Sequence, residues 1–326
     1  MLGGGPRAGG GLAAQGSGAR SHVLIIAGIA GEPKFVATFH RAALALADAA
    51  KRSGVPDSSI LYLADDTARA AARVAGRSTK EGVERAVGTL AGRAKAGDQV
   101  FIVLIGHGSA QGGQARFNLP GPDITATDFA ALLKRFPTQR VALVNAASAS
   151  GDFIAALSGA NRAIVTATKT GFESNETIFP RFFADAFAGG GADVDKDGRV
   201  SLLEAFTYAR REVARAYEEE GRLLTEHALL DDNGDHVGSA EPGPRGADGS
   251  LARTMFFSAG TGGASSSDPR VAALARDKDA AEARVDSLRR RKSTMDAAAY
   301  DRELERLLLD LATKSQALRA AEGKKP

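Results

Sequence analysis

Five apolar runs separated by amphipathic stretches are the feature that most limits the folds open to this sequence. Each run is continuously apolar and does not alternate with polar residues, which indicates strands buried on both faces. Because helical stretches lie between the runs, the sequence predicts an α/β sandwich of three layers, with helices on both faces of a mostly parallel sheet. The runs are HVLIIAG from His22, ILYLAD from Ile60, QVFIVLIGH from Gln99, RVALVNAA from Arg140 and RAIVTAT from Arg162.

Amphipathic stretches predict helices over 35–52, 79–95, 126–135, 152–157 and 178–188. Two of them have sequence signals at their start. Ser78 and Glu81 have the spacing of a capping box, and Thr125 and Asp128 form a weaker version of it. A last strand from Leu251, in LARTMFFS, is expected to close an α/β domain that spans about residues 22–258.

The two ends of the chain differ from this domain. Residues 1–21 are rich in glycine and are expected to form a disordered leader, without the basic and apolar regions of an intact secretory signal. Residues 259–268 predict a flexible linker, with Ser267 or Asp268 as the N-cap of a helix that begins at Pro269. Apolar residues at spacings of three and four over 269–322 predict a C-terminal helical hairpin.

The predicted hairpin has a heptad-like seam, as in a coiled coil. Such a seam suits a protein partner or self-association through the C-terminal helices. The same seam would also suit a hairpin that folds back onto the core. The sequence leaves both interpretations open.

Composition excludes several classes of protein. Hydrophobic residues make up 44% of the chain and charged residues 25%, which is ordinary for a soluble globular protein without a membrane span. The 42 basic residues exceed the 39 acidic ones by only 3 and are spread along the chain, which argues against a nucleic-acid partner. The absence of cysteine excludes disulfides, cysteine-ligated metals and a cysteine nucleophile.

The strongest local signal is DVDKDGRVSLLE at 193–204, which matches the twelve-residue EF-hand calcium loop at each diagnostic position. Three glycines at 189–191 break the incoming helix, whereas 202–220 supplies an outgoing one, so a single-helix calcium loop is expected. The alternative is an acidic, solvated turn with this spacing by chance. The predicted Ca²⁺ ligands are Asp193, Asp195, Asp197, the backbone carbonyl of Arg199, Ser201 and Glu204.

A second acidic stretch, DDNGD at 231–235, resembles the first half of such a loop. It has His236 where glycine is expected and lacks the terminal glutamate. A solvated Asn-Gly turn is an equally good interpretation. His227, just upstream, is interpreted as a packing or hydrogen-bonding residue and not as a ligand.

Two polar turns follow directly on apolar strands. Gly106-His107-Gly108-Ser109 comes after the run at 99–105, and Ala147-Ser148-Ala149-Ser150-Gly151 comes after the run at 140–145. Because ligands of open parallel sheets lie at the carboxyl ends of strands, His107 and Ser148 form a candidate base and nucleophile. The alternative is that both stretches are only tight turns between a strand and the next element.

These turns resemble the caspase-like peptidases, and within them the legumain-like branch. In that family a His-Gly pair follows one strand and a catalytic cysteine, before Ser-Gly, follows the next. His107-Gly108 and the Ser150-Gly151 pair match, which puts Ser148 at the cysteine position; a register without Ser-Gly would put Ala147 there. The resemblance covers about residues 22–258 and extends to the stretches Ala27-Gly28 through His40, Phe117-Asn118-Leu119-Pro120 and Ala167-Thr168.

The departures from the family decide what the resemblance implies. A serine in place of the cysteine is a poorer nucleophile, and Phe39 stands where legumain-type enzymes have an arginine for substrate asparagine. The resemblance therefore implies a calcium-binding pseudopeptidase that serves as a binding or scaffolding module. The alternative is a hydrolase, a peptidase or esterase, with a Ser148–His107 dyad ordered by calcium, which requires the two side chains within hydrogen-bonding reach.

Calcium affinity bears on where the protein works. A lone calcium loop without a paired partner is expected to bind weakly, in the range of about 10⁻⁴–10⁻³ M. Such a loop fills most readily outside the cytoplasm, in the bacterial periplasm or after secretion. Bacterial members of the resembled family combine the core with an inserted calcium loop, which fits this expectation.

Overall fold

The computed structural model describes residues 19–68, 71–189, 191–243, 247–260, 269–290 and 295–321. Most of the predicted leader and linker, with both candidate N-caps of the C-terminal hairpin, lies outside the described residues. The division of the chain into leader, core, linker and hairpin units stays a prediction.

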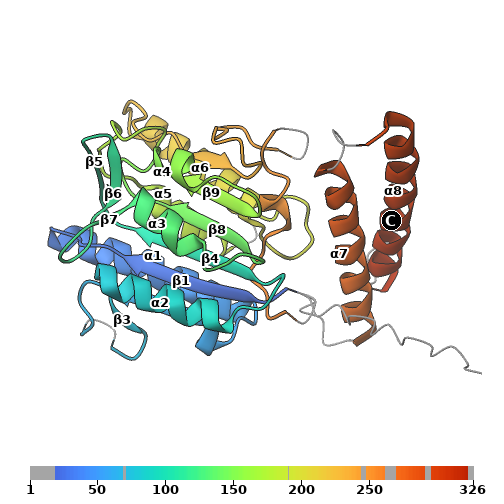
Figure 1. The fold of residues 1–326 in the computed structure, drawn as a ribbon, viewed down its shortest axis with the longest axis horizontal. Helices are drawn as coiled ribbons and strands as arrows, with labels where there is room; N and C mark the ends of the chain where they lie inside the picture. The colour runs from blue at the N-terminus through green and yellow to red at the C-terminus, as the bar shows by residue number, and fades with distance from the viewer. Residues whose placement is uncertain are drawn as a thin grey trace, which may run out of the picture.

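A seven-stranded sheet in the order β10-β9-β8-β4-β1-β2-β3 forms the centre of the fold (Figure 1). Every neighbouring pair is parallel except β10 with β9, which is antiparallel. The five predicted strands are the five longest of this sheet. The strands are β1 Ser21–Ala27, β2 Ile60–Ala64, β3 Gly76–Arg77, β4 Gln99–Ile105, β8 Arg140–Asn145, β9 Arg162–Thr166 and β10 Leu229–Asp231.

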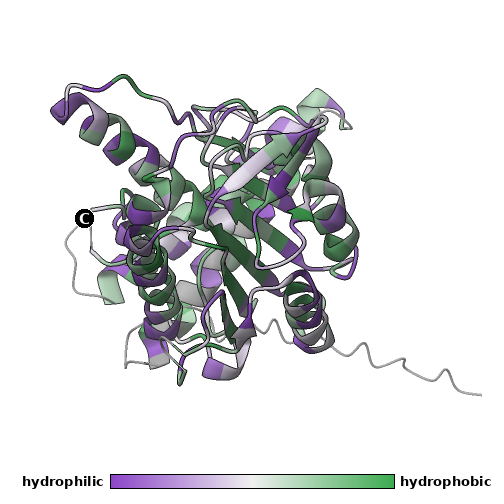
Figure 2. Ribbon diagram, turned by 90° about the vertical axis from the view of Figure 1, so that its left-hand side faces the viewer, coloured by the Kyte–Doolittle hydropathy of each residue, from purple (hydrophilic) through white to green (hydrophobic). Residues whose placement is uncertain are grey.

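Helices cover both faces of the sheet because successive side chains of each strand point to opposite faces. Val23 and Ile25 pack with α1, α5 and α6, whereas Leu24 and Ile26 pack with α2, α3 and α4. Figure 2 shows these strands as a continuous hydrophobic centre. The predicted α/β fold with a mostly parallel sheet is confirmed. The helices are α1 Pro33–Arg52, α2 Lys80–Arg93, α3 Ala126–Leu133, α4 Phe153–Leu157, α5 Phe179–Ala186 and α6 Leu202–Glu219.

The strand predicted from Leu251 is wrong. Residues Ala252–Thr254 form a 3₁₀ turn, and Phe256 makes only an isolated bridge with Ser201. The cause is the Asp232 carboxylate, which accepts the backbone N–H groups of Leu251 and Ala252, both at 2.7 Å. These two N–H groups are therefore not available to pair with a neighbouring strand. One edge of the sheet is formed by β10 instead.

A small antiparallel sheet follows His107, where the sequence predicted only a turn. It consists of β5 Gly108–Gln111, β6 Gln114–Phe117 and β7 Ile124–Thr125. Gly112 and Gly113 connect β5 to β6 with φ of +60° and +75°. Positive φ at both central residues is the requirement of a tight hairpin turn, which glycine meets without strain.

One of the two predicted helix starts is confirmed and the other is wrong. Thr125 and Asp128 form a complete capping box at the start of α3. At α2 the N-cap is Thr79, whose side chain accepts from the Gly82 N–H, and not Ser78. The Ser78 N–H instead donates to the Ala64 carbonyl at 2.9 Å, which continues the pairing of β3 with β2.

The predicted C-terminal hairpin is confirmed as two helices, α7 Pro269–Arg290 and α8 Ala297–Ala321, which stand beside the α/β domain (Figure 1). They share a small apolar core of Val285, Leu288, Tyr300 and Leu307. Within the described part of the chain, no helix combines the length and apolar character needed to span a membrane.

The turn after β8 makes a close main-chain contact that depends on glycine. A Cβ at Gly151 would lie 2.2 Å from the backbone of Lys169. We therefore expect Gly151→Ala to destabilise the fold by about 1–3 kcal/mol, the usual range for overpacking. Denaturant unfolding measures this change. Gly92→Ala is the control, because Gly92 is in α2 with no atom within 4 Å of its Cβ position and should gain about 0.5–1 kcal/mol. Equal unfolding midpoints for the two variants would contradict the prediction.

Candidate functional site

The carboxyl ends of β4 and β8 lie side by side and bring the two polar turns together. The strands are parallel with Leu104 opposite Asn145, and the Ala146 N–H donates to the Leu104 carbonyl at 2.9 Å. His107 and Ser148 therefore lie at adjacent strand ends, as predicted. This edge is where open parallel sheets bind ligands.

The Ser148 side chain is closed off from solvent, with 3% of the residue exposed. Its Oγ accepts from the Gly108 N–H at 3.2 Å and donates to the Gly108 carbonyl at 3.3 Å. The two turns also touch main chain to main chain, because a Cβ at Gly108 would lie 2.3 Å from the Ser148 carbonyl oxygen. From the other side, the Ala149 N–H donates to the Glu173 carbonyl at 2.8 Å. Ser148 is therefore held as a buried hydrogen-bonding residue between two segments.

The His107 imidazole lies against Ala30, Phe35 and Phe39. Its Nε2 lies 3.3 Å from the Ala30 carbonyl oxygen, and its ring is edge-on to Phe35 and Phe39 at 4.9 and 5.2 Å between centroids. Since a carbonyl oxygen only accepts, Nε2 is the donor in this contact, and in the neutral ring Nδ1 is the nitrogen that can accept a proton. Among the described residues, no hydrogen bond joins the His107 and Ser148 side chains.

Glu176 is an acidic neighbour of His107 that sequence reasoning missed. It lies in the segment after β9, and the charges of His107 and Lys34 act to lower its pKa. Burial outweighs them and raises the pKa of Glu176 above its usual value. No motif marks this residue, because its approach to His107 comes from the sheet order and not from sequence spacing.

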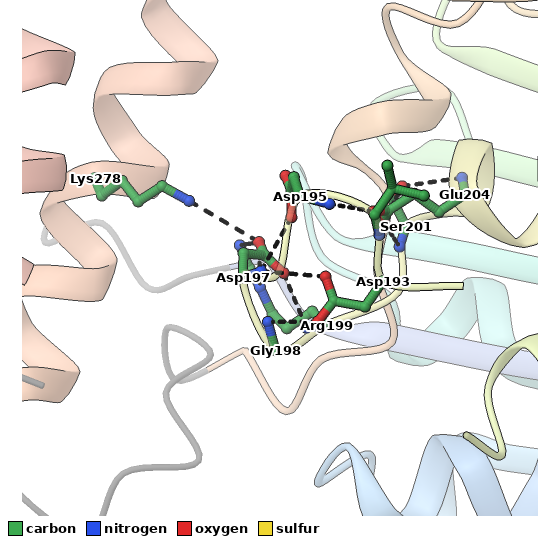
Figure 3. Close-up of polar contacts among 9 residues, drawn as sticks. Asp193, Asp195, Asp197, Gly198, Arg199, Ser201, Glu204 and Lys278 are labelled. Atoms are coloured by element: carbon green, nitrogen blue, oxygen red, sulfur yellow. Dashed lines mark hydrogen bonds and ion pairs between the residues drawn. The ribbon is translucent and has the colours of Figure 1, made fainter. Parts of the chain in front are cut away.

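The predicted calcium loop is folded at the start of α6 (Figure 3). Ser201 and Glu204 form a capping box: the Ser201 Oγ accepts the Glu204 N–H, and Glu204 Oε2 accepts the Ser201 N–H at 2.8 Å. The Asp193 carboxylate accepts the N–H groups of Asp197 and Gly198 at 3.1 and 3.0 Å. Gly198 has φ of +86°, the left-handed conformation that glycine provides at the sharp turn of such loops.

Carboxylate oxygens gather inside this loop. One oxygen from each of Asp193, Asp195 and Asp197 lies within 4.8 Å of the others. Glu204 Oε1 accepts the Val194 N–H at 2.9 Å, so this carboxylate faces the beginning of the loop. Burial raises the pKa of Asp195, and the charges of Asp197 and Glu204 raise it further. A hard dication that takes oxygen ligands fits this set of donors.

Two cationic side chains already reach the loop at Asp197. The Arg199 guanidinium lies 2.9 Å from Asp197 Oδ2, and Lys278 of α7 brings its Nζ to 3.9 Å from the same oxygen (Figure 3). The sequence predicted a Ca²⁺-ligand role for the backbone carbonyl of Arg199 and no role for its side chain. Its side chain also lies over the Phe256 ring at 4.2 Å. A metal ion at Asp197 would compete with these cations for one carboxylate oxygen.

The second acidic stretch is an ordered part of the fold. The Asp232 carboxylate is used structurally, because it accepts N–H groups of the segment 249–252. Asp248, 2% exposed, lies against the stretch and accepts the Asp232 N–H at 3.0 Å. Burial raises the pKa of Asp248 to about 6, and the charges of Asp232, Asp231 and Asp235 add to this rise. Asp248 was not a sequence candidate, since it lies far along the chain from the stretch.

His227 pairs with an acidic side chain, as its sequence interpretation allowed. Its Nδ1 lies 2.6 Å from Glu173 Oε1, and its backbone N–H donates to Glu173 Oε2 at 3.1 Å. The interaction fixes the segment after β9 against the segment before β10. His227 is therefore a hydrogen-bonding residue in this structure.

Comparison with protein-family models and with curated protein sequences finds no match. Among solved structures, the Drosophila initiator caspase Dronc aligns with a TM-score of 0.42 and 9% identity, over 65% of this chain and 79% of that chain. Caspase-1 from Spodoptera frugiperda aligns with a TM-score of 0.41 and 9% identity, over 66% of this chain and 86% of that chain. At these values the likeness is one of partial shape, and no residue role or activity follows from it.

Proposed function

We propose that this chain is a calcium-binding protein whose caspase-like, legumain-like α/β core works as a binding or scaffolding module without peptidase activity. The observation that carries the proposal is the loop 193–204, which has the sequence and the hydrogen bonds of an EF-hand loop. The caspase-like relationship is supported by His107 and Ser148, which stand at the carboxyl ends of neighbouring strands.

The calcium part of the proposal rests on charge and geometry together. Three carboxylates within 4.8 Å repel one another, and the Arg199 and Lys278 cations both lie at one of them, Asp197. A bound Ca²⁺ would neutralise them and would stabilise the start of α6 through Glu204. Asp193, Asp195, Asp197, Ser201, Glu204 and the Arg199 carbonyl are the residues that would hold it.

The lack of peptidase activity in this proposal rests on the surroundings of Ser148. A serine nucleophile needs a base that takes its proton. The Ser148 hydroxyl instead donates to the Gly108 carbonyl, and the His107 Nε2 is engaged at the Ala30 carbonyl. The alternative function, a Ser148–His107 hydrolase ordered by calcium, requires the Ser148 hydroxyl to leave the Gly108 carbonyl and to reach the other ring nitrogen of His107, Nδ1.

The binding role is supported by the C-terminal hairpin. Leu308 and Leu309 of α8 are 40% and 64% exposed, although both are large and apolar. Exposed leucines on one amphipathic helix suit a protein partner or a second copy of this chain. A weak calcium site suits an extracytoplasmic location, in the periplasm or after secretion.

Calcium binding is tested by isothermal titration calorimetry of the whole chain. We expect binding with Kd of about 10⁻⁴–10⁻³ M, and a loss of at least about tenfold in affinity for Glu204→Gln, which removes a charged bidentate ligand. Glutamine still forms a capping box, so the start of α6 is kept. Glu218→Gln, an exposed position on the same helix, is the control and should bind like the wild type. A wild-type loop site without measurable affinity would refute the calcium assignment.

The absence of turnover is tested with a serine-reactive fluorophosphonate probe. We expect no labelling of the wild type with or without millimolar Ca²⁺, because Ser148 is buried and its hydroxyl is engaged at Gly108. Ser148→Ala gives the background signal, and an active serine hydrolase in the same tube shows that the probe reacts. Labelling that requires both Ser148 and Ca²⁺ would overturn this prediction and favour the hydrolase.

A further inference from the structure

The helix α7 brings a lysine to the loop 193–204 from another part of the fold. Lys278 Nζ lies 3.9 Å from Asp197 Oδ2, and the two side chains are only 16% and 11% exposed (Figure 3). Lysine side chains are rarely buried unless an opposite charge pairs with them. The contact therefore places a positive charge of the C-terminal hairpin against an acidic loop of the α/β domain.

The Lys278 charge acts on a second carboxylate of the loop as well. Burial and neighbouring carboxylates raise the pKa of Asp195, and the Lys278 charge acts in the opposite direction. Asp195 and Asp197 are positions 3 and 5 of the loop, and both are predicted Ca²⁺ ligands. Lys278 thus lowers the repulsion among the same carboxylates that a bound Ca²⁺ would neutralise.

The two cations at Asp197 differ in where they come from. Arg199 belongs to the loop itself, so its pairing with Asp197 is a contact within one short segment. Lys278 belongs to α7, so its pairing with Asp197 links the loop to the C-terminal hairpin. A change of charge at Asp197 therefore acts on the hairpin through Lys278.

The hairpin and the α/β domain have separate apolar cores. The hairpin core is made of residues of α7 and α8, whereas the two clusters of the α/β domain end at Phe257. Among the described residues, no side chain belongs both to a cluster of the domain and to that of the hairpin. Without a shared apolar core, the docking of the hairpin relies more on polar contacts such as that of Lys278 with Asp197.

We propose that Lys278 competes with Ca²⁺ for the loop 193–204, so that calcium binding releases the C-terminal hairpin from this loop. The inference rests on the proposed function, because it takes the loop as the calcium site. The ammonium group of Lys278 would be repelled by a dication at the same oxygen and would lose the negative charge that holds it there. The coupling is reciprocal, so a hairpin docked through Lys278 lowers the affinity of the loop for Ca²⁺ by the same factor.

The competition is tested by calorimetric titration of the full chain with Ca²⁺. We expect Lys278→Gln to bind at least about threefold more tightly than the wild type, because it removes the competing charge. Lys278→Arg keeps this charge and should bind like the wild type. Arg302→Gln, which removes a positive charge at an exposed position of α8, is the control and should also bind like the wild type. Equal affinities of Lys278→Gln and the wild type would overturn the proposal.

Release of the hairpin is measured as the distance between two spin labels, one on each part. The chain contains no cysteine, so Thr89→Cys on α2 and Asp301→Cys on α8, both at exposed positions, give two specific labelling sites. We expect saturating Ca²⁺ to broaden the distance distribution. Adding Lys278→Gln should broaden it without Ca²⁺, whereas Lys278→Arg should keep it narrow until Ca²⁺ is added. A distribution that Ca²⁺ leaves unchanged, in protein that binds calcium, would overturn the proposal.

The outcomes separate this inference from the proposed function. Calcium binding that Glu204→Gln weakens and Lys278→Gln leaves unchanged would refute the role of Lys278 and keep the proposed function. No calcium binding by the wild type or by Lys278→Gln would refute both. Tighter binding by Lys278→Gln, together with a distance distribution that Ca²⁺ broadens, would support both.

Discussion

The parallel pairing of β1, β4 and β8 is the interaction on which the rest of the structure depends. These strands lie at the centre of the sheet and are buried at every position except Arg140, which is partly exposed, so helices must cover both faces. Parallel strands also end at the same edge. The turns that follow β4 and β8 must therefore meet, which sets the contact between Gly108 and Ser148.

That contact determines the surroundings of the two candidate residues, Ser148 and His107. A Cβ at position 108 would lie 2.3 Å from the Ser148 carbonyl oxygen, so the backbones approach as closely as glycine permits. At this distance the Ser148 hydroxyl hydrogen-bonds with the Gly108 backbone, and the imidazole of His107 packs edge-on against both Phe35 and Phe39. The more tightly the two turns pack, the less accessible the Ser148 hydroxyl is to other partners.

The sequence predicted the elements that are specified locally. Long apolar strands, the capping box at Thr125 and Asp128 and the loop at 193–204 are each determined by neighbouring residues. The features that the sequence did not predict depend on contacts between residues that are far apart in the chain. The strand β10 is only three residues long, so it leaves little pattern in the sequence. The run from Leu251 is apolar but does not form a strand, because its first N–H group donates to the distant Asp232 carboxylate. Glu176 and Asp248 were missed for the same reason, because only the fold brings them to their charged neighbours.

The segment that follows Asp248 joins the two acidic loops. At one end, Asp232 accepts the N–H groups at the start of the 3₁₀ turn Ala252–Thr254. At the other end, the Leu202 N–H donates to the Met255 carbonyl at 2.9 Å, and Phe256 bridges to Ser201 in the loop at 193–204. One short segment therefore touches the capping box of the first loop and the Asp232 carboxylate of the second acidic stretch. Two acidic loops that are far apart in sequence are in this way joined through the backbone of one short segment.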